Sequence, residues 1–176
     1  MRLKTALLAI YDLVSVRVAV AAPAADSCSL PQNLQLEVLN KYPGSRLVTV
    51  QDLAPDDRAL FQKEHGNDCP GLTKINFYGD GRPTLALVLI VGTGESVNAK
   101  LVVAHESAQK WKAVLIDTAK ASIPVVWSQG PGKYEDIYGE KKIQATKPVS
   151  VFCEYNAWAI VFAWTGNRVD KIWLRD

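Results

Sequence analysis

The sequence has few of the residues that build metal centres and catalytic sites. Only two histidines occur among its 176 residues, which argues against a metal site made of several histidines. It contains no Gly-x-Ser-x-Gly elbow, no phosphate-binding loop and no glycine fingerprint for dinucleotides. An excess of one charge sign is also lacking, because the net charge is only +2. We therefore expect no cofactor and no attraction to nucleic acid.

Two neighbour pairs are the candidates for catalysis, His105 with Glu106 and Cys153 with Glu154. Both pairs fall in expected strands, where adjacent side chains point to opposite faces of a sheet. The members of each pair would therefore not converge on a substrate. Whether the protein is an enzyme stays open, and the sequence favours a protein that is not one.

The start of the chain has the features of an export signal. Residues 1–24 combine a basic start, a mostly apolar middle and the small residues Ala22-Pro23-Ala24 that a signal peptidase reads. Asp12 and Arg17 interrupt the apolar part, so an amphipathic helix that stays on the protein is the alternative. No later stretch has the roughly 18 apolar residues of a membrane span. We expect a signal peptide at 1–24 and a single periplasmic or secreted domain at 25–176.

Three cysteines allow one disulfide and leave one thiol over. An oxidising compartment favours such a bond. We predict a Cys69–Cys153 disulfide, because Cys69 lies in an expected ordered loop and Cys153 in an expected core strand. Cys28 would lie near the loose start of the mature chain, and its role stays open. Without export, all three cysteines would be buried and reduced.

Helix signals come first along the chain and strand signals follow. Two helices are predicted at 31–41 and 55–65, the second with Pro55 in its first turn and Gly66 just after its end. The segment 84–91 is apolar nearly throughout, and alternating segments separated by short turns continue to the end of the chain. We predict an α+β fold, an antiparallel β-meander sheet with two N-terminal helices packed on one face.

The segment 157–164 separates large apolar side chains from small ones. One face would carry Trp158, Ile160, Phe162 and Trp164, and the other Ala159, Val161 and Ala163. We expect the large face on the main core and the small face under close cover. Most of the five tryptophans lie in such apolar strands, so we expect them in the core rather than on a carbohydrate-binding surface.

Residues 76–86, Asn-Phe-Tyr-Gly-Asp-Gly-Arg-Pro-Thr-Leu-Ala, resemble the calcium loop of FG-GAP and related extracellular repeats. Calcium requires about six to eight oxygen ligands, usually including several carboxylates. Here Asn76 and Asp80 are the candidate ligands, while Tyr78 and Thr84 stand where the family has further ligands. The sequence favours a turn that leads into a buried strand, with calcium binding as the alternative.

A glycine- and proline-containing segment at 130–139 is the candidate binding surface. Tyrosine provides the large amphipathic contact area that binding surfaces favour. The candidate binding residues are Lys133, Tyr134, Glu135, Asp136 and Tyr138. The alternative is an ordinary connecting loop with its tyrosines folded down.

The order of several short motifs resembles a group of uncharacterised exported bacterial proteins. These motifs are Lys-Tyr-Pro-Gly at 41–44, Asp-Cys-Pro-Gly at 68–71, Phe-Tyr-Gly-Asp-Gly at 77–81, Pro-Val-Val-Trp at 124–127, Pro-Gly-Lys-Tyr-Glu-Asp at 131–136, and Ala-Trp-Thr-Gly with Lys-Ile-Trp-Leu at the end. The resemblance spans most of the expected mature chain. It implies secretion and a shared fold, and no activity.

The sequence thus favours a non-enzymatic binding or interaction module of the cell envelope or secreted space, with a protein partner there. A small secreted hydrolase with an unrecognised site is one alternative. A calcium-stabilised structural domain is the other.

Overall fold

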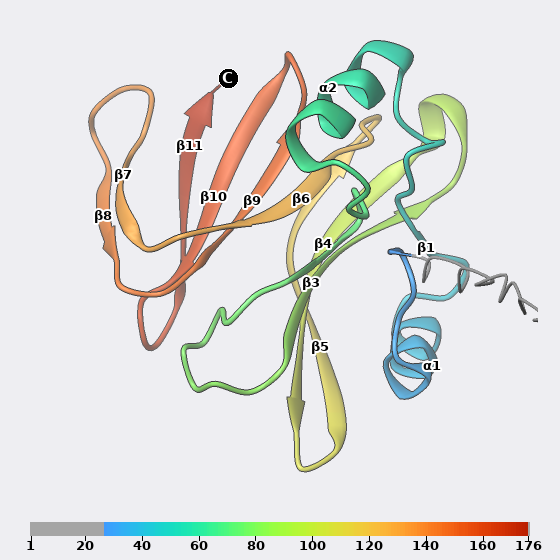
Figure 1. Cartoon of the computed structure of the whole chain (residues 1–176), viewed down its shortest axis with the longest axis horizontal. Helices are drawn as coiled ribbons and strands as arrows, with labels where there is room; N and C mark the ends of the chain where they lie inside the picture. Colours follow the sequence, from blue (N-terminus) through green and yellow to red (C-terminus); the bar gives the residue numbers. More distant parts are fainter. Residues whose placement is uncertain (1–26, 176) are drawn as a thin grey trace, which may run out of the picture.

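The computed structural model describes residues 27–175, which form two helices, one 3-10 turn (Gly94–Ser96) and eleven strands (Figure 1). Helix α1 spans Gln32–Lys41 and helix α2 spans Pro55–His65. Both lie where the sequence predicts helices. The expected signal peptide at 1–24 lies outside the described residues.

The first sheet has five strands, all paired in antiparallel fashion. Its order is β1-β3-β4-β5, with β2 also paired to β3. The strands are β1 (Arg46–Leu47), β2 (Leu72–Lys74), β3 (Thr84–Val91), β4 (Asn98–Ser107) and β5 (Lys110–Lys120). β5 forms one edge of this sheet.

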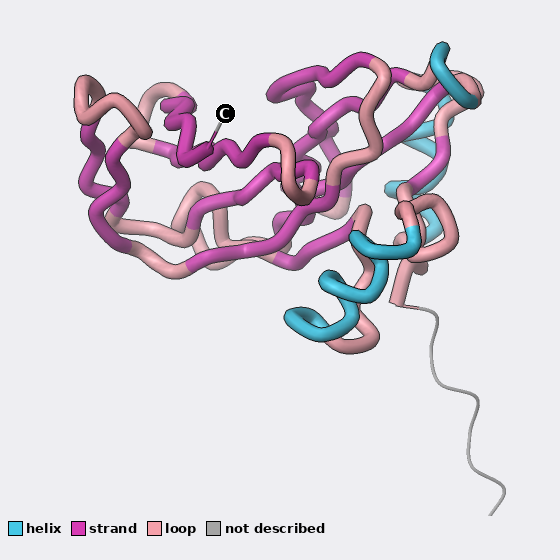
Figure 2. Tube along the Cα trace, turned by 90° about the horizontal axis from the view of Figure 1, so that it is seen from above, coloured by secondary structure: helices cyan, strands magenta, loops and turns pink. Residues whose placement is uncertain are grey.

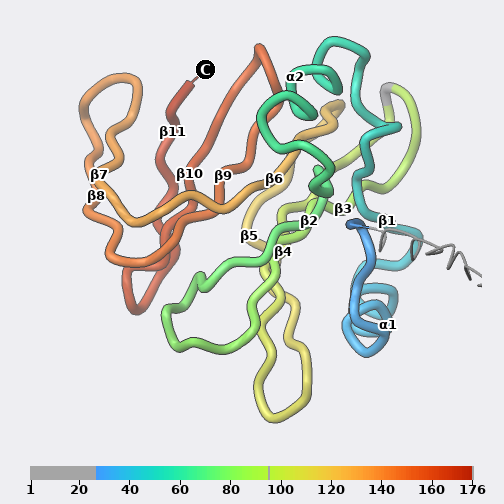
Figure 3. Tube along the Cα trace, in the orientation of Figure 1, coloured from blue at the N-terminus to red at the C-terminus, as the bar shows by residue number. Residues whose placement is uncertain are grey.

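The second sheet has four antiparallel strands in the order β11-β10-β9-β6. They are β6 (Val125–Gln129), β9 (Val149–Glu154), β10 (Trp158–Trp164) and β11 (Val169–Arg175). Strands β7 (Gly132–Glu135) and β8 (Lys142–Ala145) form a separate two-stranded sheet, the β7–β8 hairpin. The second sheet and the hairpin both come from the C-terminal part of the chain, coloured yellow-orange to red in Figure 3.

An apolar cluster between the two sheets, the inner cluster, forms the main core. It comprises Val48, Leu53, Phe61, Ile75, Phe77, Ala86, Val88, Ile90, Val97, Ala99, Leu101, Val103, Val125, Val126, Phe152, Ile160 and Phe162. Strands of both sheets contribute to it, and α2 adds Phe61. The two sheets therefore pack face to face, as in a sandwich.

The outer face of each sheet has a cover of its own. Helix α1 covers the first sheet through the α1-side cluster, Leu34, Val38, Leu87, Leu89, Val102, Ala104 and Ala113. The β7–β8 hairpin covers the second sheet through the hairpin-side cluster, Tyr134, Ala145, Val149, Val151, Cys153, Val161, Ala163 and Ile172. Helix α1 and the hairpin consequently lie at opposite ends of the molecule in Figure 1 and in Figure 2.

The α+β class is confirmed, but the single meander is wrong. The strands divide among three sheets because three apolar clusters, rather than one, need cover. The placement of both helices on one face is wrong as well. Helix α1 packs outside the first sheet, whereas α2 contributes to the inner cluster, and β1 separates the two helices along the chain.

The two-faced pattern of β10 is confirmed. Ile160 and Phe162 belong to the inner cluster, with Trp158 and Trp164 packed against it. Val161 and Ala163 belong to the hairpin-side cluster, where small side chains let the hairpin approach closely.

The disulfide joins Cys28 to Cys69, and the predicted Cys69–Cys153 bond is wrong. The Cys28 and Cys69 Cα atoms lie 5.0 Å apart, within the range that a disulfide spans. Cys153 is a buried free thiol in the hairpin-side cluster, on the outer face of the second sheet. The start of the described chain is fixed, since both bonded sulfurs contact the carbonyl oxygen of Val48, at 3.9 and 3.7 Å.

Neither helix within residues 27–175 has the length and apolar character needed to cross a membrane.

Removal of the disulfide should destabilise the fold. The bond closes a loop with a sequence separation of 41 residues, so the Cys28→Ser/Cys69→Ser double variant should lose about 2–4 kcal/mol of unfolding free energy. Denaturant unfolding followed by circular dichroism measures the loss. A reductant should lower the stability of the parent protein and leave that of the double variant unchanged. Equal stability of parent and double variant would contradict the prediction.

Candidate functional site

A cavity of about 280 Å³ opens between the edge strand β5 of the first sheet and strands β9, β10 and β11 of the second. We name it the β5–β11 cleft. Its lining residues are Asp117, Thr118, Ala119, Lys120, Ser122, Phe152, Glu154, Trp158, Ile160, Lys171 and Trp173. The cleft brings together acidic, basic, hydroxyl and indole groups from segments far apart in the sequence.

A β-bulge turns Asp117 into the cleft. The pairing of β4 with β5 skips Ile116, because Leu115 and Asp117 face consecutive residues of β4. Side chains alternate between faces, so one extra residue reverses the faces that follow it. Ala113 lies in the α1-side cluster before the bulge, whereas Asp117 reaches the second sheet after it. Without the bulge, Asp117 would point to the outer face.

A second bulge borders the same cleft on the opposite wall. Ile160 of β10 faces Trp173 of β11, but the preceding Ala159 faces Arg175, so Leu174 is the extra residue. Trp173 lies on the face that Ile160 turns to the inner cluster. Bulges are frequent next to functional sites, where they direct a side chain or end the pairing.

An ion pair crosses the cleft from one sheet to the other. Lys171 Nζ donates to Asp117 Oδ2 at 2.5 Å, and Asp117 Oδ1 accepts from the Thr118 amide at 2.9 Å. The same ammonium lies 4.8 Å from the ring centroid of Trp173 and 5.8 Å from that of Phe162. Lys171 therefore combines a charge pair with two cation–π contacts.

Two tryptophans form an aromatic wall. The rings of Trp158 and Trp173 are 6.4 Å apart in an edge-to-face arrangement, and Phe152 supports Trp158 at 5.1 Å. Trp173 is 38% exposed. The expectation of core tryptophans is correct only in part, because none of the five is buried. Trp158 and two others pack one side on the inner cluster and keep some surface accessible.

One polar group of the cleft is not used by the fold. The Glu154 carboxylate makes no side-chain hydrogen bond or ion pair with another residue of the described chain, so a ligand can bind to it. The Ser122 hydroxyl also lacks a hydrogen-bond partner, but it is buried and does not reach the cleft.

The predicted binding segment is a β-hairpin rather than an open loop. Tyr134 is buried and its hydroxyl donates to the Gly130 carbonyl at 2.5 Å. Glu135 pairs with Lys142 at 2.8 Å, and Asp136 Oδ1 accepts from the Glu140 amide at 2.8 Å. These contacts stabilise the hairpin and its turn.

The remaining candidates of that segment, Lys133 and Tyr138, are exposed. The hairpin turn also touches the cleft wall, since the Ile137 amide donates to the Trp173 carbonyl at 3.0 Å. The binding role of the segment stays a prediction, but its turn lies beside the cleft.

Asn76 and Asp80 shape the turn before β3. Asn76 Oδ1 accepts from the Gly81 amide at 3.3 Å, and Asp80 Oδ1 accepts from the Arg82 amide at 3.1 Å. Asp80 Oδ2 also lies 3.0 Å from His105 Nε2. The hydrogen bond from the Arg82 amide lowers the pKa of Asp80, and the charge of His105 acts in the same direction. These oxygens serve the turn, and a calcium role for them stays a prediction.

Cys153 lacks the character of a nucleophile. Burial raises the pKa of its thiol to about 12, and the nearby Glu64, Glu154 and Asp57 carboxylates act in the same direction. A thiolate, not a thiol, is the reactive form. Neighbouring Tyr155 donates its hydroxyl to Glu64 Oε2 at 3.2 Å, and burial raises its pKa too.

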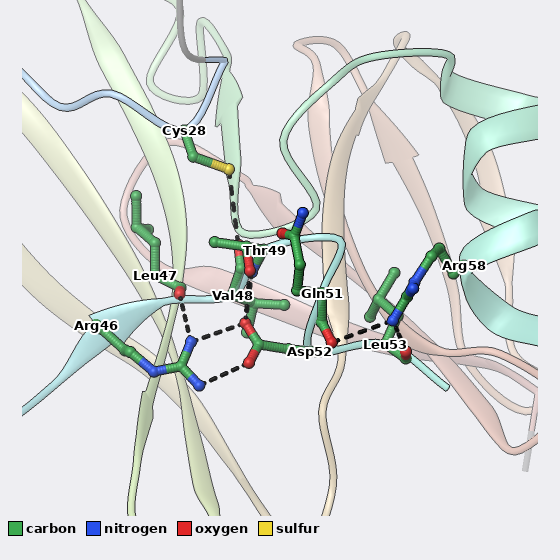
Figure 4. Close-up of polar contacts among 9 residues, drawn as sticks. All are labelled: Cys28, Arg46, Leu47, Val48, Thr49, Gln51, Asp52, Leu53 and Arg58. Atoms are coloured by element: carbon green, nitrogen blue, oxygen red, sulfur yellow. Dashed lines mark hydrogen bonds and ion pairs between the residues drawn. The ribbon is translucent and has the colours of Figure 1, made fainter. Parts of the chain in front are cut away.

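Two other cavities, of about 440 and 340 Å³, flank the disulfide. Two of the polar side chains that line them, Arg46 and Thr49, are engaged in the fold (Figure 4). Arg46 donates two hydrogen bonds to Asp52, at 2.7 and 2.6 Å, and Thr49 donates two more. Close by, Arg58 of α2 donates to the backbone carbonyls of Gln51 and Leu53, in the loop before that helix. The smaller β5–β11 cleft is the better candidate, because it combines two tryptophans with an ion pair that joins the two sheets.

Comparison with known proteins found no matching family model, no similar curated protein and no similar solved structure. The resemblance to exported bacterial proteins therefore stays a prediction.

The Arg46–Asp52 pair should make stability depend on pH. The bonds from Arg46, and then those from Thr49, lower the pKa of Asp52. A lowered folded-state pKa stabilises the fold above the ordinary value of about 3.9, and this stabilisation is lost as pH falls through the lowered value. Asp52→Asn should cost about 1–2 kcal/mol near neutral pH.

Urea unfolding at several pH values tests this, with the exposed Asp68→Asn as the matched control. The difference between the parent protein and Asp52→Asn should shrink below about pH 4. A difference that stays constant down to the acid limit would contradict the assignment.

The Cys153 thiol should resist alkylation. At about pH 8, near the ordinary thiol pKa of about 8.5, iodoacetamide should leave the native protein unmodified. After unfolding without reductant, mass spectrometry should find one modified cysteine, Cys153. Rapid modification of the folded protein would show that the thiol is accessible and reactive.

Proposed function

We propose that this protein is a non-enzymatic binding module that holds a small ligand in the β5–β11 cleft. The observation that carries the proposal is the convergence of Asp117, placed by a bulge, with Lys171 and Trp173 of the other sheet. Pockets that combine an aromatic wall with a few placed polar groups are typical ligand sites. The volume of about 280 Å³ suits a small molecule or a single side group of a larger one.

The state of the residues that could perform catalysis favours a binding protein over an enzyme. The Cys153 thiol stays protonated, because burial raises its pKa to about 12. His105 lies against Asp80 and the Tyr78 ring, and is not among the residues that line the cleft. Lys171 is held by Asp117 as an ion pair. The cleft lacks an activated nucleophile of the usual kind.

The disulfide supports a place outside the reducing cytosol. Structural disulfides persist in the periplasm and in the extracellular space, and the Cys28–Cys69 bond fixes the start of the described chain. A periplasmic or secreted location is part of the proposal.

A protein partner in the cell envelope would find its contact surface beside the cleft. Ile137 and Tyr138, in the hairpin turn, are 41% and 68% exposed. The Ile137 amide bond to Trp173 places this turn at the cleft rim. The small ligand would then be a group carried by that partner.

Indole NMR tests whether the cleft binds ligands. The five tryptophan Nε1–H signals are assigned with single Trp→Phe variants and followed during titration with neutral sugars, dipeptides, nucleosides and fatty acids. A ligand of the cleft should shift the signals of Trp158 and Trp173. Trp173→Phe should weaken that binding about tenfold, as for a central contact residue.

The matched control is Trp111→Phe. Trp111 lies on the α1 side, where its Nε1 donates to Asn33 Oδ1 at 3.1 Å. Its replacement should leave the affinity unchanged. If no compound of the panel shifts the Trp158 and Trp173 signals, the proposed function is wrong.

A further inference from the structure

We infer that the ligand of the β5–β11 cleft is a neutral saccharide. The inference rests on the proposed function and adds the chemical class of the ligand. Four properties of the cleft carry it: its charged groups, the aromatic wall, the hydrogen-bonding groups, and the position of Lys171.

The charged groups of the cleft disfavour an anion. Asp117 and Glu154 supply two carboxylates, and the Lys171 ammonium is already held by Asp117. Lys120 borders the cleft from the opposite face of β5, because its side chain alternates with that of Ala119, which packs on the inner cluster. An anionic ligand would therefore meet repulsion from the carboxylates.

The aromatic wall suits a ring that is apolar on its face and polar at its rim. Trp158 and Trp173 offer indole surface at an edge-to-face angle, and Trp173 is 38% exposed. A pyranose ring presents C–H groups on its faces and hydroxyls around its edge. The part of the Trp173 indole that stays exposed beside Lys171 can accept the apolar face, while the surrounding polar groups bind the hydroxyls.

The polar groups of the cleft offer both donors and acceptors. The Asp117 carboxylate uses two of its about four acceptor positions for Lys171 and Thr118. Glu154 adds further acceptors, and the Lys171 ammonium has donors beyond the one that it gives to Asp117. Sugar hydroxyls also donate and accept, so they can satisfy this mixture. A fatty-acid chain would leave these groups unpaired.

A cationic ligand is disfavoured because the protein already supplies the cation. The Lys171 ammonium lies 4.8 Å from the Trp173 ring centroid and 2.5 Å from Asp117 Oδ2. It takes the position over the aromatic ring where a ligand ammonium would bind. An anion such as phosphate would in turn approach the Asp117 and Glu154 carboxylates.

The experiment compares probes by class, with the indole signals of Trp158 and Trp173 as the readout. The neutral probes are glucose, maltose, cellobiose, N-acetylglucosamine and its disaccharide. The comparison probes are glucuronate, inorganic phosphate, phenethylamine and a neutral dipeptide. We expect at least one neutral saccharide to shift both signals in a saturable way, and the comparison probes to leave them unchanged.

Variants then assign the contacts. Trp173→Ala should weaken the saccharide about tenfold or more, as for a main contact residue. Glu154→Gln should weaken it several-fold without altering the fold, because Glu154 has no side-chain partner within the described chain. Trp111→Phe and Glu106→Gln, the latter on β4 and away from the cleft lining, should bind as the parent does.

The possible results test the saccharide inference and the proposed binding function separately. A comparison probe that binds at Trp158 and Trp173 while no saccharide does would overturn the saccharide and keep the binding site. Saccharide binding that survives Trp173→Ala would place it elsewhere and overturn the inference. If no probe shifts the Trp158 and Trp173 signals, both the saccharide inference and the proposed binding function are wrong. Release of new reducing ends, lost in Glu154→Gln, would keep the saccharide and replace binding by hydrolysis.

Discussion

The apolar packing between the two sheets is the interaction on which the rest of the structure depends. Each large side chain of the inner cluster contributes about 1.5–3 kcal/mol by burial, and α2 adds Phe61 to it. Along one side the sheets meet, where the Val126 amide of β6 donates to the Pro70 carbonyl before β2. At the β5 and β11 edges they stay apart, and the cleft opens between those edges.

Apolar packing holds the two sheets together, so their arrangement does not depend on the Lys171–Asp117 pair that bridges the cleft. Their side chains are 38% and 22% exposed, and pairs that reach solvent contribute about 0–1 kcal/mol. A ligand can therefore exchange hydrogen bonds with either partner at small cost to stability. A contribution this small would be of little use in a core contact, but it is compatible with a site where a ligand replaces the contact.

The sequence contains the elements but not their assembly. The two helices and the two faces of β10 follow from apolar spacing and capping signals, because these are local properties. The division into three sheets does not, and neither does the bulge at Ile116, which alone decides the face of Asp117. A one-residue change of register reverses every face that follows. Asp117 and Lys171 are 54 residues apart, so no motif could link them.

The protection of sheet edges connects the hairpin to the cleft. Exposed edge strands invite pairing with other chains, and proteins protect them with charge or with cover. β5 carries Lys110, Lys112 and Lys120 along its length, whereas the hairpin turn covers β11 through the Ile137–Trp173 backbone bond. The segment that the sequence marks as a binding surface therefore protects an edge and forms a rim. The lysines of β5 and the hairpin turn beside β11 therefore protect the two edges that border the cleft against pairing with a further strand.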